Sequence, residues 1–319
     1  MKALIIYHDN CPDGMTAAWI AEGVLSQAHD TKIISASYED GPPWDFIDSH
    51  TFIYIVDFSY PAKELKEICD YAHQVVVLDH HASAIKKLTG FDHPFCTLNF
   101  SLDNSKSGAG LTWEWFFPDT PMPEFIQYVQ ARDLWLKDSL PDVDLVCAGM
   151  SAFEFTLEAW DKLAKTPIKT LKEAGYWINK KLEKERKALL EECHPIYFGD
   201  SFAMSCNVPG FMASDMGHLI LEQFPSTPFA ITYYDTGKGT RKFSLRSNDS
   251  REAVNSIAEA FGGGGHRNAA GCEVALTEVN DKGWVYYPVK IPDIFFEQDE
   301  IDEEEEQQRL AKGIVDEEE

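Results

Sequence analysis

Acidic and imidazole side chains follow three separate apolar stretches in the first third of the chain. They occur in "YHDNCPDG" at residues 7–14, "VDF" at 56–58 and "LDHH" at 78–81. The apolar run before "DHH" lacks polar alternation, which is typical of a strand buried on both faces of a parallel sheet. Because the carboxyl ends of such strands meet at one edge of the sheet, the following side chains are expected to converge there: His8, Asp9, Asp13, Asp57, Asp79, His80 and His81.

A mixed set of carboxylate and imidazole donors suits manganese, iron or zinc, whereas magnesium alone favours oxygen ligands. A pair of such ions can promote attack of water on phosphorus. Taken singly, an acid at a strand end such as Asp57 is more often a turn acid or a cap, here for the helix expected from Pro61, and a lone histidine is usually solvated or packed. The occurrence of all three segments together favours a metal site.

The elements that must position these side chains alternate between strand and helix patterns. Strands are predicted at 3–7, 32–38, 51–58 and 74–81, with helices at 15–25 and 61–72. This order predicts an α/β fold with a doubly wound, mostly parallel sheet. Helical, aromatic-rich segments at 107–117 and 123–138 are expected to cover that sheet.

A charged amphipathic helix is predicted over about 168–192, as a linker to a smaller α+β domain. In that domain, strands are expected at 201–208, 228–235 and 240–247, and a helix is expected to open at an Asp or Ser cap within 249–261. The predicted organisation is a catalytic domain at 1–165, a linker helix at 166–195, a substrate-binding domain at 196–290 and an acidic disordered tail at 291–319.

The net charge and the composition limit the kinds of partner that the chain is expected to bind. The formal net charge is −25, and the stretch from residue 292 carries 13 acids against Arg309 and Lys312, which leaves −14 for the rest. Long or duplex nucleic acid is therefore an unfavourable partner. No apolar stretch reaches the ~18 residues of a membrane span, and the start has no signal-like run, so a cytoplasmic protein without membrane contact is expected. The seven cysteines form no CxxC pair, which favours reduced and mostly buried thiols.

The three acidic segments together resemble the motifs of the DHH phosphoesterase superfamily. The matching stretches are "HDNCPDGMTAAW", "IVDFSYP" and "VLDHHAS", and "YVQARDLWLKD" offers Asp133 in the context of a fourth motif. In the second domain, "FGGGGHRNAAGCEV" at 261–274 resembles the motif of the DHH-associated domain, and "FSLRSN" resembles the segment that supplies its arginine. The resemblance covers roughly residues 1 to 290.

The resemblance implies two metal ions, with Mn²⁺ as the expected metal and Mg²⁺ as the alternative. The metal-binding residues that it implies are His8, Asp9, Asp13, Asp57, Asp79, His80 and Asp133, with Asp57, His80 and His81 as the catalytic set. Asp79 either binds metal directly or orients the neighbouring histidines. The implied substrate-binding residues are Arg246, Gly264, Gly265, His266, Arg267 and Asn268.

Two residues depart from the family's first motif, because Cys11 and Met15 occupy positions where relatives carry an acid. Cys11 is either a soft ligand or a packed side chain. The predicted function is a metal-dependent phosphodiesterase, of exonuclease or oligoribonuclease type, acting on short single-stranded oligonucleotides or small nucleotide compounds. The alternatives are a phosphatase acting on the nucleoside bisphosphate pAp and a catalytically impaired nucleotide-binding module. A homodimer is left open.

Overall fold

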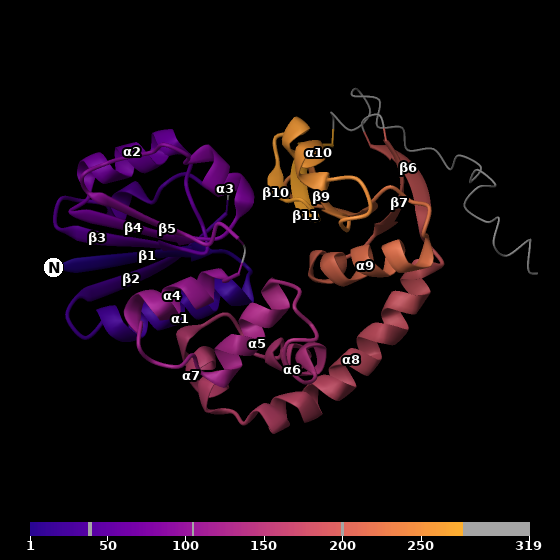
Figure 1. The fold of residues 1–319 in the computed structure, drawn as a ribbon, viewed down its shortest axis with the longest axis horizontal. Helices are drawn as coiled ribbons and strands as arrows, with labels where there is room; N and C mark the ends of the chain where they lie inside the picture. The colour runs from indigo at the N-terminus through magenta and orange to yellow at the C-terminus, as the bar shows by residue number, and fades with distance from the viewer. Residues whose placement is uncertain (38–39, 104, 199–200, 277–319) are drawn as a thin grey trace, which may run out of the picture. The chain divides into compact units, whose positions relative to one another are not determined.

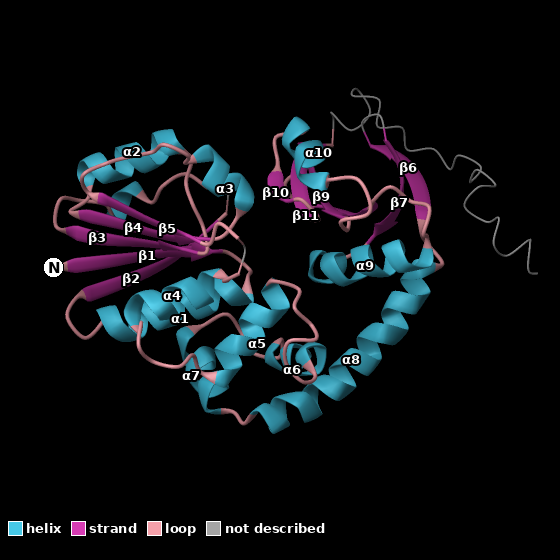
Figure 2. Cartoon of the chain, in the orientation of Figure 1, coloured by secondary structure: helices cyan, strands magenta, loops and turns pink. Residues whose placement is uncertain are grey.

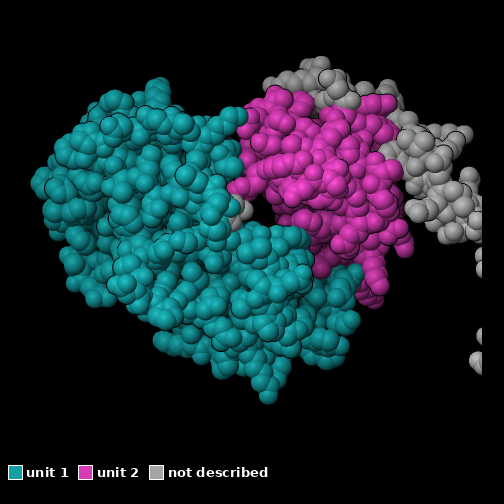
Figure 3. Space-filling model, viewed as in Figure 1, with its two compact units in different colours: residues 1–183 teal, residues 184–319 magenta. Residues whose placement is uncertain are grey.

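The computed structural model describes residues 1–37, 40–103, 105–198 and 201–276. The chain divides into two compact units, residues 1–183 and 184–319 (Figure 3). The predicted acidic tail at 291–319, and the part of the predicted second domain beyond residue 276, lie outside the described residues.

The first unit is built on a five-stranded sheet in the order β2-β1-β3-β4-β5 (Figure 1). All four strand pairs are parallel. The strands are β1 (Lys2–His8), β2 (Asp30–Ala36), β3 (Thr51–Val56), β4 (Gln74–Asp79) and β5 (Cys96–Phe100). This confirms the predicted α/β fold with a doubly wound parallel sheet, and it adds β5, which the sequence patterns did not predict.

Helices cover both faces of this sheet, with α2 on one side and α1 and α4 on the other (Figure 2). Beyond these layers, α5 packs against α1 and α4, α7 packs against α1, and α6 packs against α5. The helices are α1 (Pro12–Leu25), α2 (Ala62–Tyr71), α3 (Ala82–Lys87), α4 (Gly108–Phe116), α5 (Glu124–Asp133), α6 (Val143–Met150) and α7 (Leu157–Lys165), with a 3₁₀ turn, η1, at Trp44–Phe46.

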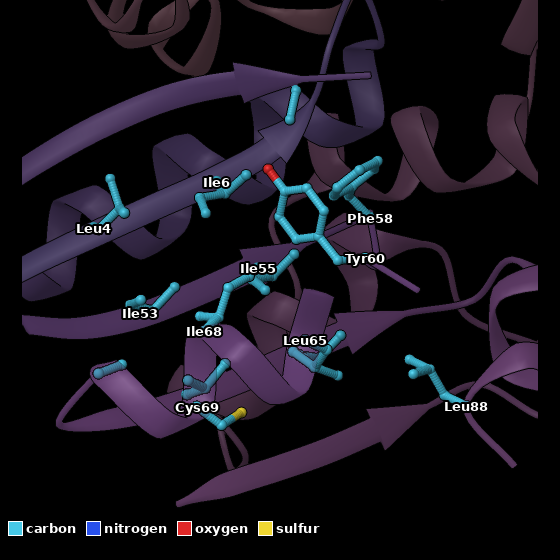
Figure 4. Packing of buried hydrophobic residues seen from close by; sticks show 14 residues of the cluster. Leu4, Ile6, Ile53, Ile55, Phe58, Tyr60, Leu65, Ile68, Cys69 and Leu88 are labelled. Carbon is cyan, nitrogen blue, oxygen red and sulfur yellow. The ribbon is translucent and has the colours of Figure 1, made fainter. Parts of the chain in front are cut away.

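The apolar runs of the central strands divide between the two faces because successive side chains point to opposite sides. On one face the strand residues pack against Leu65 and Ile68 of α2, as Figure 4 shows. On the other face Ile5 and Leu78 pack against Ala17 of α1. Burial on both faces explains why the strand sequences are continuously apolar.

Helix α8 (Ile168–Leu190) contains the boundary between the two units and leads into a six-stranded mixed sheet. The order is β10-β11-β9-β8-β7-β6, in which only β7 and β8 are parallel among the described pairs. The strands are β6 (His194–Phe198), β7 (Ser201–Asn207), β8 (Ala230–Asp235), β9 (Thr240–Arg246), β10 (Gly264–His266) and β11 (Ala269–Ala275); the helices are η2 (Gly210–Met212), α9 (Ala213–Gln223) and α10 (Val254–Ala260).

The predicted Asp or Ser cap of the helix in 249–261 is wrong, because α10 begins at Val254 with Ala253 at the cap position. The residues expected to begin the helix are used in a turn instead. Ser250 bonds to Asn248, and Asp249 accepts a hydrogen bond from Asn268 at 2.8 Å. Local hydrogen bonds of Ser and Asp compete with helix formation in this way. Within the part of the chain that the structure describes, no helix combines the length and apolarity needed to span a membrane.

Candidate active site

Three of the sequence-predicted residues lie at adjacent strand ends of the first sheet. His8 ends β1, Asp57 follows β3, and Asp79 ends β4. The strand order reverses between β1 and β3, since β2 lies on the outer side of β1. Such a switch point opens a crevice at the carboxyl ends of the strands, where α/β proteins bind ligands.

Asp57 lies at the centre of this crevice in a left-handed conformation, with φ of 56°. Its backbone N–H donates to the Leu78 carbonyl at 2.8 Å, which keeps the turn attached to β4. Gly108, the first residue of α4, lies so close that a Cβ there would be 2.4 Å from the Asp57 Cβ. A non-glycine residue at φ above zero is uncommon, and such residues cluster at functional sites.

The Asp57 carboxylate is buried, and neither of its oxygens accepts an aligned hydrogen bond from a described residue. Its Oδ2 lies 3.6 Å from His8 Nδ1, and its Oδ1 lies 3.3 Å from His80 Nε2. His80 Nε2 also lies 3.3 Å from Oδ2 of Asp133, the last residue of α5. The fourth predicted segment therefore reaches the same point as the first three.

Asp13 enters the cluster from the first turn of α1 and is also buried. Its Oδ1 accepts hydrogen bonds from Ser107 Oγ at 2.6 Å and from the Ala109 N–H at 3.2 Å. Its Oδ2 is buried and has no hydrogen-bond partner among the described residues. A buried carboxylate oxygen without a donor is unfavourable unless a cation compensates it.

Three overlapping groups of donor atoms result, and within each group the atoms lie within 4.8 Å of one another. Asp57 and His80 each belong to two of the groups, so the groups form one continuous cluster. The groups are His8, Cys11 and Asp57; Asp57, His80 and His81; and Asp13, His80 and Asp133. The mixture of carboxylate, imidazole and thiol donors fits a divalent cation, and the three groups offer enough donors for more than one ion. Cys11, one of the two departures from the family motif, contributes a sulfur to this cluster.

The pKa values of the cluster reflect crowded buried charge. Burial, followed by the charges of Asp57 and Asp133, raises the pKa of Asp13 well above its usual range. Burial is also the largest effect on Asp57, but the facing nitrogens of His8 and His80 outweigh it and hold its pKa below the usual range. Burial lowers the pKa of His80, yet Asp57 and Asp133 raise it overall to about 11. The buried carboxylates of Asp13, Asp57 and Asp133 therefore repel one another, and the positive charge of the neighbouring histidines offsets this repulsion only in part.

Asp79 differs from the other acids because its oxygens are occupied by hydrogen bonds. Its Oδ1 accepts from His81 Nδ1 at 2.8 Å and from the backbone N–H groups of His80 and His81 at 2.8 and 3.1 Å. Its Oδ2 accepts from Ser59 Oγ at 2.5 Å. Burial is the largest effect on Asp79 and raises its pKa, but the charge of His81 and its hydrogen bond lower it overall. Of the two roles open from sequence, this arrangement favours orientation of the histidines.

Asp9 lies outside the three donor groups found among the described residues. Its carboxylate accepts a hydrogen bond from Asn10 Nδ2 at 2.6 Å, and its backbone N–H donates to the Ala36 carbonyl at 3.0 Å. A direct metal-binding role for Asp9 stays a prediction.

Sequence reasoning missed Ser107 and Ser59, which hold Asp13 and Asp79. Ser107 was recognisable as a helix cap, because Ser before a run of small residues is a common N-terminal signal, and its Oγ accepts from the Gly110 N–H at 3.3 Å. Nothing in the sequence pairs Ser107 with Asp13. The contact depends on the packing of α4 against α1.

In the second unit, strand register brings two predicted substrate-binding residues to one face of the sheet. Arg246 lies opposite Ala269, and Ala269 lies opposite His266. Residues directly opposite one another project to the same face. Only the small side chain of Ala269 lies between Arg246 and His266 in this row.

Helix α9 fixes the position of the Arg246 side chain. Arg246 Nε bonds to Ser214 Oγ at 3.4 Å, and an added Cβ on Gly217 would lie 2.5 Å from Arg246 Cγ. The glycine therefore makes room for the arginine stem between α9 and the sheet.

The predicted residues Gly264 and Gly265 form the backbone of β10. Gly265 has φ of 141°, and a Cβ there would lie 2.5 Å from the Ala269 carbonyl oxygen. This position therefore requires glycine. The motif folds as a tight hairpin in which β10 runs back against β11.

Arg267 and Asn268 form the two-residue connection of that hairpin. Arg267 donates to the carbonyls of Asn248 and Arg251 at 2.9 and 3.1 Å, while Asn268 Nδ2 donates to Asp249 at 2.8 Å. These bonds tie the hairpin to the turn before α10. Contact of either side chain with substrate stays a prediction.

Comparisons with known proteins add a viral relative and a shared fold. No family model matches the chain. "Uncharacterized protein R106" of Acanthamoeba polyphaga mimivirus is 30% identical over 291 residues, which cover 84% of this chain and 66% of that protein. The chain thus spans slightly under two thirds of the relative's length.

Among solved structures, an exopolyphosphatase-related protein from Bacteroides fragilis matches with a TM-score of 0.50 at 14% identity, covering 88% of this chain and 90% of that one. The chain has the same fold as that protein. The DHH domain of a member of a family of ribosomal proteins gives a TM-score of 0.48 at 14% identity, covering 88% of this chain and 84% of that one. At such identities the likeness concerns the fold alone, so activity and substrate have to be argued from the site.

Proposed function

We propose that this DHH-fold protein is a metal-dependent phosphodiesterase that hydrolyses short oligonucleotides or small nucleotide compounds. The observation that carries the proposal is the convergence of His8, Asp13, Asp57, His80 and Asp133 at one sheet edge. Oδ2 of Asp13 is buried without a hydrogen-bond donor among the described residues, and the buried oxygens of Asp57 are faced by imidazole nitrogens at 3.3 and 3.6 Å. Such buried carboxylates suit the binding of a cation.

The residues that would hold two Mn²⁺ ions, with Mg²⁺ as the alternative, come from the three donor groups and are His8, Asp13, Asp57, His80 and Asp133. Asp57, shared between two groups, is the candidate bridging carboxylate. The chemistry supplied by bound divalent ions is Lewis acidity toward a phosphate group. Direct binding by Asp9 and Asp79 is the less favoured part of the predicted ligand set, because hydrogen bonds already engage their carboxylates.

His81 is the proposed proton donor to the leaving oxygen. Asp79 accepts its Nδ1–H at 2.8 Å, and Ser59 holds the other oxygen of Asp79. This chain of contacts fixes the imidazole ring and directs Nε2 to proton transfer. The arrangement follows the common design in which a carboxylate orients a catalytic histidine.

Arg246 and His266 are the proposed donors for another phosphate or a base of the substrate. Arginine suits this task because its guanidinium can make paired, charge-assisted hydrogen bonds to phosphate oxygens. Gly264 and Gly265 keep the backbone beside His266 free of side chains, and Arg267 and Asn268 are proposed to support this surface from the hairpin connection.

The net charge favours a short substrate. At −25 the chain repels a long polyanion wherever its phosphates lie away from local cationic groups. A dinucleotide presents few phosphates outside the site, so oligoribonuclease-type cleavage is favoured over processive digestion of long DNA.

The test incubates metal-stripped protein with a 5′-labelled RNA dinucleotide and, separately, with pAp, each with and without added Mn²⁺. The variants are Asp57→Asn and His81→Ala, with Asp92→Asn as the matched control at an exposed acid outside the donor groups. Manganese-dependent production of mononucleotides that both variants lose, and the control keeps, is the expected result.

Two other outcomes would overturn the proposal in different ways. Release of orthophosphate from pAp without dinucleotide cleavage would identify a phosphatase. Binding of Mn²⁺ and nucleotide without turnover of either substrate would identify a nucleotide-binding module. The absence of an acid at Cys11 and Met15, where relatives carry one, would then be the first explanation to test.

A further inference from the structure

Two cysteines of the second unit lie close together: Cys193 directly precedes β6, and Cys206 belongs to β7. In the antiparallel β6–β7 pair, His194 is in register with Ser205. One step beyond this pair, the same register places Cys193 opposite Cys206. Opposed residues of antiparallel strands have Cα atoms about 4.5–5.5 Å apart, which falls within the range of about 4.4–6.8 Å that a disulfide bridges.

The side chains of these cysteines also converge. The Sγ atoms of Cys193 and Cys206 lie 3.7 and 3.2 Å from the same acceptor, the carbonyl oxygen of Leu189. The two thiols also contact each other directly, and the hydrogen bond from Cys193 lowers the pKa of Cys206. The backbone register and the directions of the side chains therefore both place the two sulfur atoms next to each other.

Leu189 belongs to the last turn of α8, where carbonyl groups lack donors from within the helix. The Leu189 carbonyl also accepts from the Glu192 N–H at 3.1 Å, and its bond from Cys206 connects the end of α8 to β7. Cys193 is half-buried, whereas Cys206 is fully buried. Exposure makes Cys193 the sulfur that an oxidant reaches first. The hydrogen bond between the two thiols raises the pKa of Cys193 and lowers that of Cys206, so Cys206 is the thiolate that attacks in the next step.

We propose that Cys193 and Cys206 are a redox modification site, which forms a reversible intrachain disulfide on contact with a peroxide or a small-molecule disulfide. With peroxide, Cys193 is oxidised to a sulfenic acid as the O–O bond breaks and one water leaves. The Cys206 sulfur then attacks the Cys193 sulfur and releases a second water. With a small disulfide, two exchange steps release two small thiols instead.

The other cysteines offer a contrast within the same chain. Cys69 of α2 contacts Cys96 of β5, but this pair joins a helix to a strand and has no cross-strand register. Cys272 of β11 lies opposite Phe243. The pairing at Cys193 is therefore expected to be selective, and the link would fasten β6, the edge strand of the sheet, to β7.

The experiment treats the full-length folded protein with oxidised glutathione or with hydrogen peroxide in separate arms. Remaining thiols are then alkylated, and peptides are mapped by mass spectrometry without reduction. The expected result is loss of two of the seven alkylatable thiols, recovery of a crosslinked peptide pair containing Cys193 and Cys206, and full reversal by dithiothreitol. The same treatment in denaturant should give no such selectivity, because the register is lost.

Variants separate the proposal from general thiol reactivity. Cys206→Ser should leave Cys193 as a single thiol that ends as a mixed disulfide with glutathione, while Cys272→Ser should form the link as the wild type does. Full alkylation of Cys193 and Cys206 after treatment of the wild type would overturn the proposal, as would a crosslink confined to Cys69 and Cys96. Peptide mapping of the oxidised wild-type protein tests the proposal by itself, even where a variant folds poorly.

Discussion

The two candidate binding regions, the strand-end cluster of the first unit and the hairpin region of the second, differ in how their charged side chains are paired. In the first unit, Asp13 keeps a buried oxygen without a hydrogen-bond donor among the described residues, and the buried Asp57 oxygens are faced by imidazole nitrogens at 3.3 and 3.6 Å. In the second unit, Arg267 bonds to backbone carbonyls and Arg241 is paired with Asp235 at 2.5 Å. The strand-end cluster thus has the donor groups of a candidate metal site, whereas Arg267 and Arg241 of the second unit are engaged by groups of that unit.

Replacing the central carboxylate should give the largest effect. Asp57→Asn removes the charge shared by two donor groups, and we expect activity to fall by about 10³-fold or more, since several kcal/mol of charge stabilisation are lost. Asparagine tolerates the left-handed conformation, so the far-ultraviolet circular dichroism should stay unchanged. Steady-state kinetics measures the effect, and full activity in a folded variant would contradict it.

Loss of the arginine in the second unit should affect binding more than chemistry. Arg246→Gln removes one charge-assisted contact, worth about 1.5–3 kcal/mol, so KM should rise by roughly 10- to 100-fold with a small change in kcat. If Arg246→Gln instead lowered kcat and left KM constant, the second unit would contribute to the chemical step, and the proposed division between the two regions would be wrong. Kinetics over a range of dinucleotide concentrations distinguishes the two cases.

A smaller effect is expected from the glycine that accommodates this arginine. Gly217→Ala places a Cβ 2.5 Å from Arg246 Cγ, so the side chain must shift and KM should rise, though less than for Arg246→Gln. Gly23→Ala in α1 is the matched control, because no atom lies within 4 Å of its added Cβ. In an Arg246→Ala background, Gly217→Ala should add nothing further to KM, and an additive rise there would argue against positioning.

The smallest expected effect concerns acid stability of the second unit. The hydrogen bond from Arg241 lowers the pKa of Asp235, so the pair stabilises the fold above the unfolded pKa of about 3.9, and this contribution is lost as the pH falls through the lower folded value. Because the Asp235 side chain is 46% exposed, solvent screening limits the contribution to under about 1 kcal/mol.

Urea unfolding of Asp235→Asn checks this effect. The variant should be less stable than the wild type at pH 7, and the difference should shrink below about pH 3. Added Mn²⁺ should leave the difference unchanged, since Asp235 lies in none of the donor groups found among the described residues. A difference that grew on acidification would contradict the assignment.

Much of the first sheet could be predicted from the sequence, because buried parallel strands carry uninterrupted apolar runs that end in His8, Asp57 and Asp79. Their convergence followed from strand topology alone. The divided roles of the acids could not be predicted, since Asp79 is engaged by Ser59 and Asp13 by Ser107 through contacts that depend on packing between distant segments.

The second unit was less predictable for a related reason. Its motif marked the right region, but the hairpin register that unites Arg246 with His266 depends on pairing across three strands. The start of α10 was misplaced because Asp249 and Ser250 bond within a turn. Side-chain competition of this kind has no signature in helical periodicity.

Manganese titration of the metal-stripped protein, followed calorimetrically for the wild type and for Asp57→Asn, tests the central claim most directly. We expect about two Mn²⁺ ions per wild-type chain, and loss of at least one of them in the variant with its circular dichroism unchanged. Equal binding by both proteins, or no binding by the wild type, would contradict a metal centre built on the strand-end carboxylates.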